Sequence, residues 1–389
     1  MAKIVHFFTD EKFTGIMINL FDKFEEHEQL YLSVPLPDTK QNYQNEKVEY
    51  ISPEQINASV AEFHPDLIIF HSLFPQNLLV LDRLETKVPI CWFSWGGDIS
   101  LGKTSVFRKS HEPLTFKAYF PNSVKTLLKH GIWNGIKKLF PKAYSSYYHK
   151  RTGEIWPNVL MNRNFRKINF VNTVIPQEQE IFKKHGFTGS FIHIPIGTIE
   201  YLAEGIDTAF SKAAENTIFL GHSSYAQNNH IDVLYRLSTS KFEGKIICPL
   251  SYGDDDYRTI VIETGKRLFG ERFIAITDYQ LKEQYFNTLK SSKLYLNNSI
   301  IQQGVGNIVV AAYLGVPVVL NAKSAVYDYL ISIGVRCFTI EKDLDSLLVG
   351  NSLLTDEENL QNRSAIESVY GEKEVKRRIT TFLDQFGKH

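Results

Sequence analysis

A short polar stretch, QQGVGN at residues 302–307, separates two apolar runs in the last third of the chain. Glycines at such a place let the backbone approach a ligand, and the free N–H groups of a helix N-terminus bind phosphate. We therefore expect a helix from about Asn307 with a phosphate site before it. A dinucleotide fingerprint would need a glycine where Val309 stands and an acid where Asn321 stands, and a Walker loop would need Gly-Lys-Ser/Thr. The stretch therefore favours a nucleoside diphosphate held by amides and a helix end.

Hydroxyl, amide and glycine residues also follow three other predicted strands, which end near residues 221, 251 and 277. Ligands of parallel sheets bind beyond the carboxyl ends of the strands, so these loops should meet QQGVGN at one edge. Each loop alone is compatible with a plain turn, but their convergence favours a site. The candidate residues for binding this nucleoside diphosphate are Gly221, His222, Ser223, Ser224, Asn228, Tyr252, Tyr279, Gln302, Gln303, Gly304, Gly306 and Asn307.

The elements that must position these loops are short apolar strands alternating with helical patterns, which is typical of parallel sheets covered on both faces. The predicted strands of the first half are 3–8, 30–35, 66–71, 88–94, 167–172 and 190–196, with helical patterns at 14–26, 53–63, 76–86 and from Gln177. The predicted strands of the second half are 216–221, 245–251, 272–277, 293–299 and 316–321, with helices at 230–237, 256–269, 282–290, from about 307 and at 372–386.

Two such series predict an α/β protein made of two doubly wound domains, with the boundary at 200–215. We assign residues 1–205 to an N-terminal domain and residues 206–370 to a C-terminal domain. A C-terminal helix over 371–389 is expected to be able to pack back on the N-terminal domain.

The composition, with 43% hydrophobic and 22% charged residues, is that of an ordinary globular protein. No apolar run approaches the roughly 18 residues of a membrane-spanning helix, and the start MAKIVHFF reads as a strand rather than a signal peptide. Cys91, Cys248 and Cys337 lie far apart without metal-ligand spacing, which indicates buried thiols in a reducing compartment.

Although the net charge is zero, residues 103–167 form a strongly basic segment, the basic block. Residues 1–100 carry 15 acids and 7 Lys+Arg, whereas residues 103–167 carry 14 Lys+Arg and 2 acids. The block is rich in aromatic residues, and its core at about 103–165 is predicted to be an insertion in the N-terminal domain. It predicts an anionic partner, and nucleic acid, a membrane surface and a diphosphate substrate all remain open.

The second half resembles glycosyltransferases of the GT-B type, whose C-terminal domain binds a nucleotide sugar through an element of the form G-x-G…G-x-P-V-V. Gly304, Gly306 and GVPVV at 315–319 match this element. Retaining members of the type carry a glutamate near the loop, where Gln302 and Gln303 stand here. The resemblance implies two Rossmann-like domains with a cleft between them, residues 1–205 binding the acceptor and residues 206–370 binding the nucleotide sugar.

The two glutamines look like one family in particular, the TDP-N-acetylfucosamine:lipid II N-acetylfucosaminyltransferases (glycosyltransferase family 56), which have Gln-Gln-Gly-x-Gly at this place. Three further stretches are similar to motifs of the family: GHS at 221–223 with Asn229-His230 downstream, WGGD at 95–98, and FHSLF at 70–74. The resemblance runs from about residue 60 to 335 and is weakest over 103–165.

The resemblance implies transfer of a deoxyamino sugar such as a 4-acetamido-4,6-dideoxyhexose, or of fucose, from a nucleoside diphosphate to a polyprenyl-diphosphate-linked or other glycan in bacterial surface polysaccharide synthesis. The donor is expected to be linked to dTDP, GDP or UDP, with no separate cofactor. The enzyme is expected to be cytoplasmic and peripheral on the inner membrane, with an anionic membrane surface and no nucleic acid as partner.

Such a transferase needs a base for the acceptor hydroxyl and hydrogen-bond donors for the departing diphosphate. We expect the base in the N-terminal domain, with Asp98 as first choice, Asp10 as second and His71 as a further candidate, because each follows or ends a predicted strand. A carboxylate in such a loop can equally cap a helix. Gln303 is assigned to the donor sugar or phosphate, because an amide does not ionise.

The segment SVKTLLKHGIWNGIKKLF at 123–140 places apolar side chains on one helical face and lysines off it, which suits a helix lying among lipid headgroups. The alternative is a helix packed on its own domain with a solvated basic face. The candidate acceptor or membrane residues are Trp95, Lys125, Lys129, Trp133, Lys137 and Lys138.

The triplet Asp254-Asp255-Asp256 invites a metal interpretation, because carboxylate pairs hold Mn²⁺ in GT-A enzymes. We interpret it instead as a helix start, where acids suit the helix dipole, and expect no metal site. Two other function classes remain open. One is a nucleotide-sugar epimerase or hydrolase of the same fold, which needs no lipid acceptor, and the other is a nucleic-acid-binding protein that uses the basic block.

Overall fold

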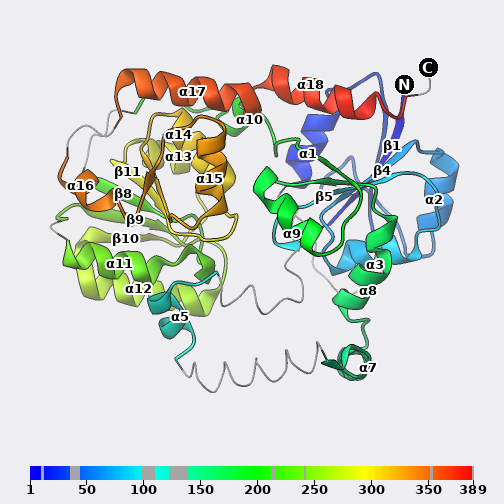
Figure 1. The fold of residues 1–389 in the computed structure, drawn as a ribbon, viewed down its shortest axis with the longest axis horizontal. Helices are drawn as coiled ribbons and strands as arrows, with labels where there is room; N and C mark the ends of the chain where they lie inside the picture. The colour runs from blue at the N-terminus through cyan, green and yellow to red at the C-terminus, as the bar shows by residue number, and fades with distance from the viewer. Residues whose placement is uncertain are drawn as a thin grey trace. The chain divides into compact units, whose positions relative to one another are not determined.

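The computed structural model describes residues 1–9, 13–35, 44–98, 110–121, 139–211, 216–240, 242–350 and 354–387. These residues form two parallel sheets, each flanked by helices (Figure 1). They divide into two compact units, the first falling within 1–98, 139–197 and 375–387 and the second within 110–121 and 198–374. The prediction of an α/β protein with two doubly wound sheets is confirmed.

The sheet of the first unit has seven parallel strands in the order β3-β2-β1-β4-β5-β6-β7. They are β1 (Lys3–Phe8), β2 (Glu28–Ser33), β3 (Glu49–Tyr50), β4 (Leu67–His71), β5 (Ile90–Phe93), β6 (Phe170–Asn172) and β7 (Ser190–Ile192). The helices are α1 (Thr14–Phe21), α2 (Ile56–Phe63), α3 (Pro75–Arg83), α7 (Pro141–Thr152), α8 (Pro157–Asn164), α9 (Gln179–Lys184) and most of α18 (Glu372–Leu383).

Both faces of this sheet are buried. Val5 and Phe7 of β1 point into one apolar cluster, and Ile4 and Phe8 point into another on the opposite face. A strand covered on both sides needs apolar side chains at successive positions, which is why KIVHFF lacks the polar alternation of a half-exposed strand. The strand order reverses between β1 and β4, and a ligand crevice of a doubly wound sheet forms at that point.

The C-terminal helix α18 covers part of the second cluster. Val375, Ile379, Phe382 and Leu383 are buried there among residues of β1 and α1. Their spacing of four, three and one residues gives a single apolar stripe on a helix. The charged side of EKEVKRRITTFL is therefore left to solvent.

The sheet of the second unit has six parallel strands in the order β10-β9-β8-β11-β12-β13. They are β8 (Thr217–Leu220), β9 (Lys245–Pro249), β10 (Phe273–Ile276), β11 (Leu294–Asn297), β12 (Val318–Leu320) and β13 (Phe338–Thr339). The helices are α5 (Pro113–Tyr119), α10 (Ile199–Leu202), α11 (His230–Thr239), α12 (Asp255–Phe269), α13 (Lys282–Lys290), α14 (Val305–Tyr313), α15 (Ala325–Ser332), α16 (Leu344–Val349) and α17 (Asp356–Tyr370).

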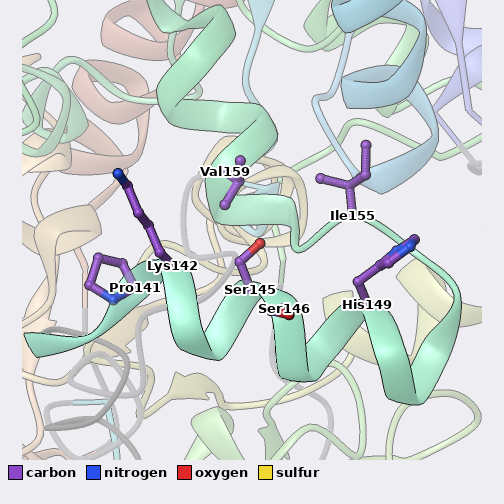
Figure 2. A pocket seen from close by; sticks show the side chains of 7 residues that line it. All are labelled: Pro141, Lys142, Ser145, Ser146, His149, Ile155 and Val159. Atoms are coloured by element: carbon purple, nitrogen blue, oxygen red, sulfur yellow. The ribbon is translucent and has the colours of Figure 1, made fainter.

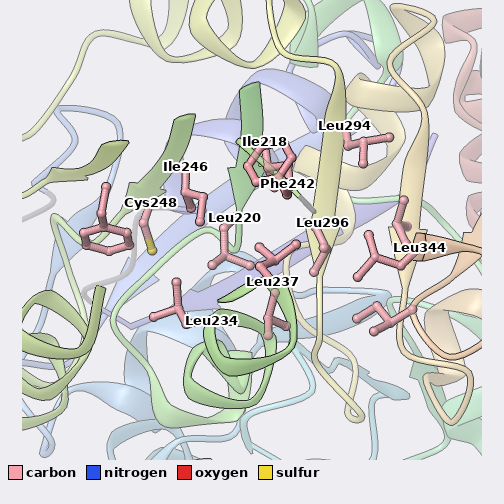
Figure 3. Packing of buried hydrophobic residues seen from close by; sticks show 14 of the residues in the cluster. Ile218, Leu220, Leu234, Leu237, Phe242, Ile246, Cys248, Leu294, Leu296 and Leu344 are labelled. Carbon is pink, nitrogen blue, oxygen red and sulfur yellow. The ribbon is translucent and has the colours of Figure 1, made fainter. Parts of the chain in front are cut away.

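The core of the second unit forms where α11 packs on its sheet. Figure 3 shows side chains of the strands, among them Leu220 and Leu296, close to Leu237 of α11. All three are fully buried. This packing holds the carboxyl ends of β8 and β11 in place, and those ends carry the predicted donor loops.

One domain assignment differs from the sequence-based expectation. Residues 110–121, expected within an insertion of the N-terminal domain, pack on the second unit instead. The two carboxylate oxygens of Asp232 on α11 accept from the backbone N–H groups of Leu114 and Thr115, each at 2.8 Å. Asp232 thereby satisfies free N–H groups at the start of α5, so a side chain more than a hundred residues away anchors this segment.

Candidate functional site

The predicted donor loops lie at the point where the strand order of the second sheet reverses. β8 and β11 are neighbours, and the chain continues from them toward opposite edges of the sheet. Gly221 and His222 follow β8, and the QQGVGN stretch follows β11. Such a reversal leaves a crevice outside the carboxyl ends of the two strands, so these two loops flank the place where a doubly wound sheet binds its ligand.

The loop after β8 makes a turn that requires glycine. Gly221 has a φ of +72°, and a Cβ built on it would lie 2.5 Å from Nε2 of His230 and 3.2 Å from Oδ1 of Asn228. Its N–H donates to the carbonyl of Leu296 on β11 at 2.8 Å. Gly221 therefore brings the β8 loop against both α11 and β11.

The loop after β11 closes against the same turn. Gly304 has a φ of +67° and immediately precedes α14. A Cβ on Gly304 would lie 2.9 Å from Nδ1 of His222 and 3.2 Å from Nδ2 of Asn297. The start of α14 and the β8 loop are thus in direct contact, which is the convergence that the sequence predicted.

The predicted helix start is wrong by two residues. α14 begins at Val305, because Gly304 takes the left-handed conformation and ends the loop, so Gly306 and Asn307 lie within the first helical turn. The side-chain amide of Asn307 donates to the hydroxyl of Tyr285 on α13 at 2.8 Å, which engages it with a neighbouring helix. A Cβ on Gly306 would meet only a methyl of Leu202 at 4.0 Å.

His222 and Asn297 contact each other at the centre of the reversal point. Oδ1 of Asn297 accepts from the N–H of Ser299 at 2.9 Å, so its Nδ2 is the atom that faces His222 Nδ1 at 3.4 Å. An amide nitrogen only donates, so in this arrangement Nδ1 of His222 accepts and its proton lies on Nε2.

Three other predicted residues, Ser223, Ser224 and Asn228, hold the loops together. The N–H and the hydroxyl of Ser224 donate to the carbonyl of Tyr252 at 2.8 and 2.9 Å, which joins the loops after β8 and β9. Nδ2 of Asn228 donates to Oγ of Ser223 at 3.1 Å. All three polar side chains are fully buried, so their contacts shape the loop as much as they offer groups to a ligand.

Some buried oxygen atoms near these loops have no hydrogen-bond partner among the described residues. They are Oδ1 of Asn228, Oγ of Ser299 and Oε1 of Gln303. Buried polar atoms almost always have a partner, so these atoms are candidates for contacts to a ligand. The side chain of Gln302 is only partly buried and has no such feature.

The structure does not gather all the predicted donor residues. Tyr279 follows β10, which lies two strands away from β8, and its side chain is 84% exposed. Tyr252 follows β9 and is 40% exposed. Tyr279 therefore lies along the same sheet edge but outside the reversal point, whereas Tyr252 contacts Ser223 and Ser224 of the β8 loop.

Sequence reasoning missed the role of Asn229. Its Nδ2 donates to the carbonyls of Ser110 and Asn298, and its Oδ1 accepts from the N–H of Glu112 at 2.8 Å. Asn229 has a φ of +52°, which is uncommon for a residue other than glycine. The Asn229-His230 pair was noticed only through the family resemblance, and its contacts to residues 110–112 had no signal in the sequence.

The structure confirms that the triplet Asp254-Asp255-Asp256 starts a helix. Asp254 is the N-cap of α12, where its Oδ1 accepts from the N–H of Tyr257 at 2.8 Å and its Oδ2 accepts from the hydroxyl of Tyr119. Asp255 pairs with Arg258 at 2.9 Å within the same helix. Among the described residues, no cluster of three or more His, Cys, Asp or Glu side chains suits a metal ion.

In the first unit, Asp98 is engaged on both oxygens. Oδ2 accepts from the N–H of Leu73 at 3.0 Å and from the indole of Trp92 at 2.7 Å, and Oδ1 accepts from Ser94 Oγ at 2.9 Å and from the N–H of Trp95 at 3.0 Å. Burial raises the pKa of Asp98, and these four hydrogen bonds oppose that rise. A base needs a free lone pair facing the substrate, so this geometry fits a tie between the loops after β4 and β5 and not the predicted base.

A buried carboxyl that sequence reasoning missed lies close to Asp98. Glu178 ends a short turn after β6, is 5% exposed, and its Oε2 has no partner among the described residues. Burial and the charge of Asp98 raise the pKa of Glu178 to about 8, against the hydrogen bonds from the backbone of Ile175 and Val174. The sequence offered no signal for this, because a lone glutamate near a helix start is usually solvated.

His71 lies at the reversal point of the first sheet. It is the last residue of β4, is 2% exposed, and its Nε2 lies 2.9 Å from Nδ1 of His6 on β1. Beside it the hydroxyls of Thr9 and Ser72 are 3.0 Å apart and join the ends of β1 and β4. Asp10, the other predicted carboxylate, lies outside the described residues.

The predicted acceptor-side residues are only partly described. The ring of Trp95 is stacked on Phe13 with centroids 4.9 Å apart and is partly exposed, so one side of the indole is occupied by protein. The predicted membrane helix lies outside the described residues from 122 to 138, and with it Lys125, Lys129, Trp133, Lys137 and Lys138.

Comparison with known proteins agrees with this geometry. Residues 186–357 match the family described as 4-alpha-L-fucosyltransferase, glycosyl transferase group 56. The chain is similar in structure to sucrose-phosphate synthase from Thermosynechococcus elongatus, with a TM-score of 0.65, 10% identity and 99% of both chains covered. It is also similar to Anabaena HepE in complex with UDP and glucose, with a TM-score of 0.61, 14% identity, and 99% of this chain and 100% of that chain covered.

A third similar structure is a putative UDP-N-acetylglucosamine 2-epimerase from Listeria monocytogenes, with a TM-score of 0.54, 14% identity, and 100% of this chain and 97% of that chain covered. At such identities these structures show the fold alone, and the family match adds the activity. The predicted GT-B fold is therefore confirmed, the resemblance to glycosyltransferase family 56 is confirmed over residues 186–357, and the chain is a glycosyltransferase.

Proposed function

We propose that the chain transfers a deoxyamino sugar, such as a 4-acetamido-4,6-dideoxyhexose, or fucose, from a nucleoside diphosphate to a lipid-linked or other glycan in bacterial surface polysaccharide synthesis. The fucosyltransferase description of the matched family supports the class of sugar. A neighbour of the same fold binds UDP, which supports a nucleoside diphosphate as the donor's activating group. In this proposal dTDP, GDP or UDP enters as part of the substrate, and the protein needs no resident cofactor or metal.

The observation that carries the proposal is the junction of Gly304, His222 and Asn297 at the reversal point of the second sheet. The first N–H groups of α14 have no partner within the helix, and they carry the positive end of the helix dipole. A diphosphate bound there accepts hydrogen bonds from fixed, preorganised groups, which stabilise the charge that develops as the leaving group departs.

The acidic side chains at the start of α12 support a donor site without a metal. The carboxylates of Asp254 and Asp255 are occupied by a helix cap, a tyrosine hydroxyl and an arginine. The diphosphate charge is then balanced by N–H and O–H donors of the protein. Backbone donors at the start of a helix are a common means of binding phosphate.

A thermal-shift panel of dTDP, UDP and GDP in EDTA tests this proposal. The matching nucleotide at 100 times its dissociation constant should stabilise the protein by roughly 2.7 kcal/mol. Stabilisation that appears only with Mn²⁺ or Mg²⁺ would refute the metal-free site. Incubation of the nucleotide sugar with and without a polyprenyl-linked acceptor then separates the alternatives: transfer supports the proposal, whereas epimerised donor or free sugar without acceptor supports an epimerase or hydrolase.

We further propose that the enzyme acts as a peripheral protein on the cytoplasmic face of the inner membrane. Helix α7 supports this, because none of its twelve residues is buried and its last turn carries His149, Lys150 and Arg151. Leu139 and Phe140 just before it are 73% and 61% exposed. A basic helix with exposed apolar and aromatic neighbours suits an anionic headgroup layer.

A shallow hollow of about 490 Å³ lies between α7 and α8. Figure 2 shows Lys142, Ser145 and His149 of α7 facing Val159 of α8 across it, with Ile155 of the connecting turn alongside. An apolar floor with a lysine and a histidine at its margin fits an acyl chain or prenyl group near a charged headgroup. None of the described helices is long and apolar enough to cross a membrane.

A further inference from the structure

We propose that Gln29 and His6 are positioning residues that set the tautomer of His71, leaving its Nδ1 as the acceptor for the proton of the substrate hydroxyl. This inference rests on the proposed transferase function and assigns the base within it. It involves a strand residue of β1 and a strand residue of β2 that no motif in the sequence singles out.

The polarity of the three side chains follows from their contacts. Oε1 of Gln29 lies 2.7 Å from Nε2 of His6, and Nδ1 of His6 lies 2.9 Å from Nε2 of His71. A carbonyl oxygen only accepts, so Nε2 of His6 carries a proton and Nδ1 of a neutral His6 has a lone pair. His71 must then donate from Nε2, and its Nδ1 is left unprotonated.

The surroundings keep both imidazoles neutral. His6 is fully buried, and Phe8 stacks on His71 with centroids 4.2 Å apart and an interplanar angle of 2°. Burial lowers the pKa of His6 to about 4, against the hydrogen bond to Gln29 and the charge of Asp22. Burial, with His6 as a smaller cause, also lowers the pKa of His71.

Within the described part of the chain, few charged and titratable groups face the pair. Asp22, after α1, accepts from the hydroxyl of Tyr31 on β2 at 2.8 Å and pairs with Lys47. Tyr31 lies beside His6, with ring centroids 5.0 Å apart, and burial raises the pKa of this tyrosine. Tyr31 stays protonated and the charge of Asp22 is paired. The contact with Gln29 therefore determines which ring nitrogens of His6 and His71 carry protons.

The free nitrogen lies where a ligand is expected. His71 ends β4 at the reversal point of the first sheet, and its Nδ1 has no hydrogen-bond partner among the described residues. The next residue, Ser72, has a φ of +75°, and strained backbone of this kind in a residue other than glycine concentrates at functional sites. Its hydroxyl and that of Thr9 add polar contacts for a sugar at the same edge.

The reaction step balances with these residues alone. The acceptor hydroxyl gives its proton to Nδ1 of His71 as its oxygen bonds to the anomeric carbon of the donor sugar. The bond from that carbon to the diphosphate oxygen breaks, and the diphosphate leaves with the electron pair. The imidazolium formed on His71 donates from Nε2 to His6, and it loses its extra proton from Nδ1 to water after the product has left.

The first test is independent of activity. In the full-length protein labelled with ¹⁵N-histidine, the resonances of His71 should show a protonated Nε2 and an unprotonated Nδ1, with His6 in the same tautomer. The opposite pattern, with a protonated Nδ1 on His71, overturns the inference and leaves the proposed transferase function standing. The expected pattern in a protein without transferase activity would instead refute the proposed function.

The second test uses two substitutions at one position. Gln29→Glu places a carboxylate that only accepts, so it keeps the polarity of the relay and should retain transfer, with the acid limb of kcat/KM moved upward by about one pH unit. Gln29→Leu removes the acceptor and should lower kcat by about tenfold or more with KM little changed. Equal loss of kcat in both variants would show that Gln29 only fills space and would refute the relay.

A matched control separates these effects from general destabilisation. Oδ1 of Asn169 accepts from the N–H of Ile90 at 2.9 Å at the opposite, amino edge of the same sheet. Asn169→Ala removes a side-chain acceptor of the same strength and should lower the melting temperature of the first unit without moving the pH profile. A pH profile that moves in Asn169→Ala as it does in Gln29→Glu would count against the inference.

Discussion

Gly304→Ala is the most direct perturbation of the proposed donor site. The residue has a φ of +67°, and an L residue in this region costs about 1–2 kcal/mol. The new methyl would also lie 2.9 Å from Nδ1 of His222, and overpacking of this kind costs about 1–3 kcal/mol. The free energy of unfolding of the second unit should therefore fall by roughly 2–5 kcal/mol.

Donor binding should fall with it. The methyl relieves its contact by pushing the β8 loop at His222 away from the start of α14, which displaces a first N–H group of α14 from the diphosphate in the proposed site. A hydrogen bond to a charged group is worth about 1.5–3 kcal/mol, so the dissociation constant of the nucleotide should rise roughly ten- to 150-fold. Isothermal titration with the nucleotide selected by the thermal-shift panel measures this change, and urea denaturation measures the stability.

Gly334→Ala is the matched control. Gly334 has a φ of +88° in the same unit, and its new methyl would meet only Cβ of Ala365 at 3.9 Å. It should show the backbone strain alone, with nucleotide affinity unchanged. If Gly304→Ala binds nucleotide as tightly as Gly334→Ala does and unfolds at the same urea concentration, the contact between the β8 loop and α14 does not shape the donor site.

Three further predictions follow from the first unit. Asp98→Asn should lower the free energy of unfolding, measured by denaturation, by about 1–3 kcal/mol, because an amide cannot accept all four hydrogen bonds. A variant that keeps full stability and loses only its turnover would show instead that Asp98 is the base. Glu178 keeps its proton in the folded state up to a pKa of about 8 but loses it near 4.5 when unfolded, so stability should decline as pH rises between these values. Glu178→Gln should abolish this decline and be the more stable protein at pH 8, by several kcal/mol at most; parallel pH–stability curves for the two proteins would contradict the buried, protonated carboxyl. Replacing Lys142, Lys150 and Arg151 with Gln should weaken binding to anionic vesicles on the order of a hundredfold in a sedimentation assay, because each charge near the surface is worth about 1 kcal/mol. If the wild-type protein does not bind such vesicles at low salt, the membrane proposal is wrong.

The sequence predicted best the elements whose residues are decided by burial on a sheet. KIVHFF forms β1 over the predicted residues, and KEQYFNTLK forms α13 over the predicted residues. A strand that is covered on both faces must be apolar throughout, and a helix that covers a sheet must be apolar on one stripe, so both patterns are local. The position of the donor loops followed from the same alternation, because strand ends of a parallel sheet share one edge.

Contacts between distant residues were beyond the reach of such patterns. α14 begins two residues before its predicted start, because Gly304 takes a left-handed conformation and ends the loop. The sequence pattern does not show that Gly304 lies against His222. Residues 110–121 joined the second unit through Asp232 and Asn229, which lie more than a hundred residues away along the chain. Asp98 was predicted to be a base because it follows a strand, and that position alone does not show that Trp92, Ser94 and Trp95, together with the more distant Leu73, donate to both of its oxygens.

The two reversal points differ in chemistry in the sense that the proposed reaction requires. At the end of β8 and β11 the groups proposed to face the diphosphate are donors, the first N–H groups of α14, and donors stabilise the negative charge that grows on a departing diphosphate. At the end of β4 the group left over is an acceptor, Nδ1 of His71, and an acceptor is what a hydroxyl needs as it loses its proton. If the two arrangements were exchanged, the acceptor hydroxyl would face hydrogen-bond donors and the diphosphate would face a hydrogen-bond acceptor. The tautomer of His71, which Gln29 sets through His6 in the proposed relay, is therefore the feature on which the assignment of the acceptor side depends.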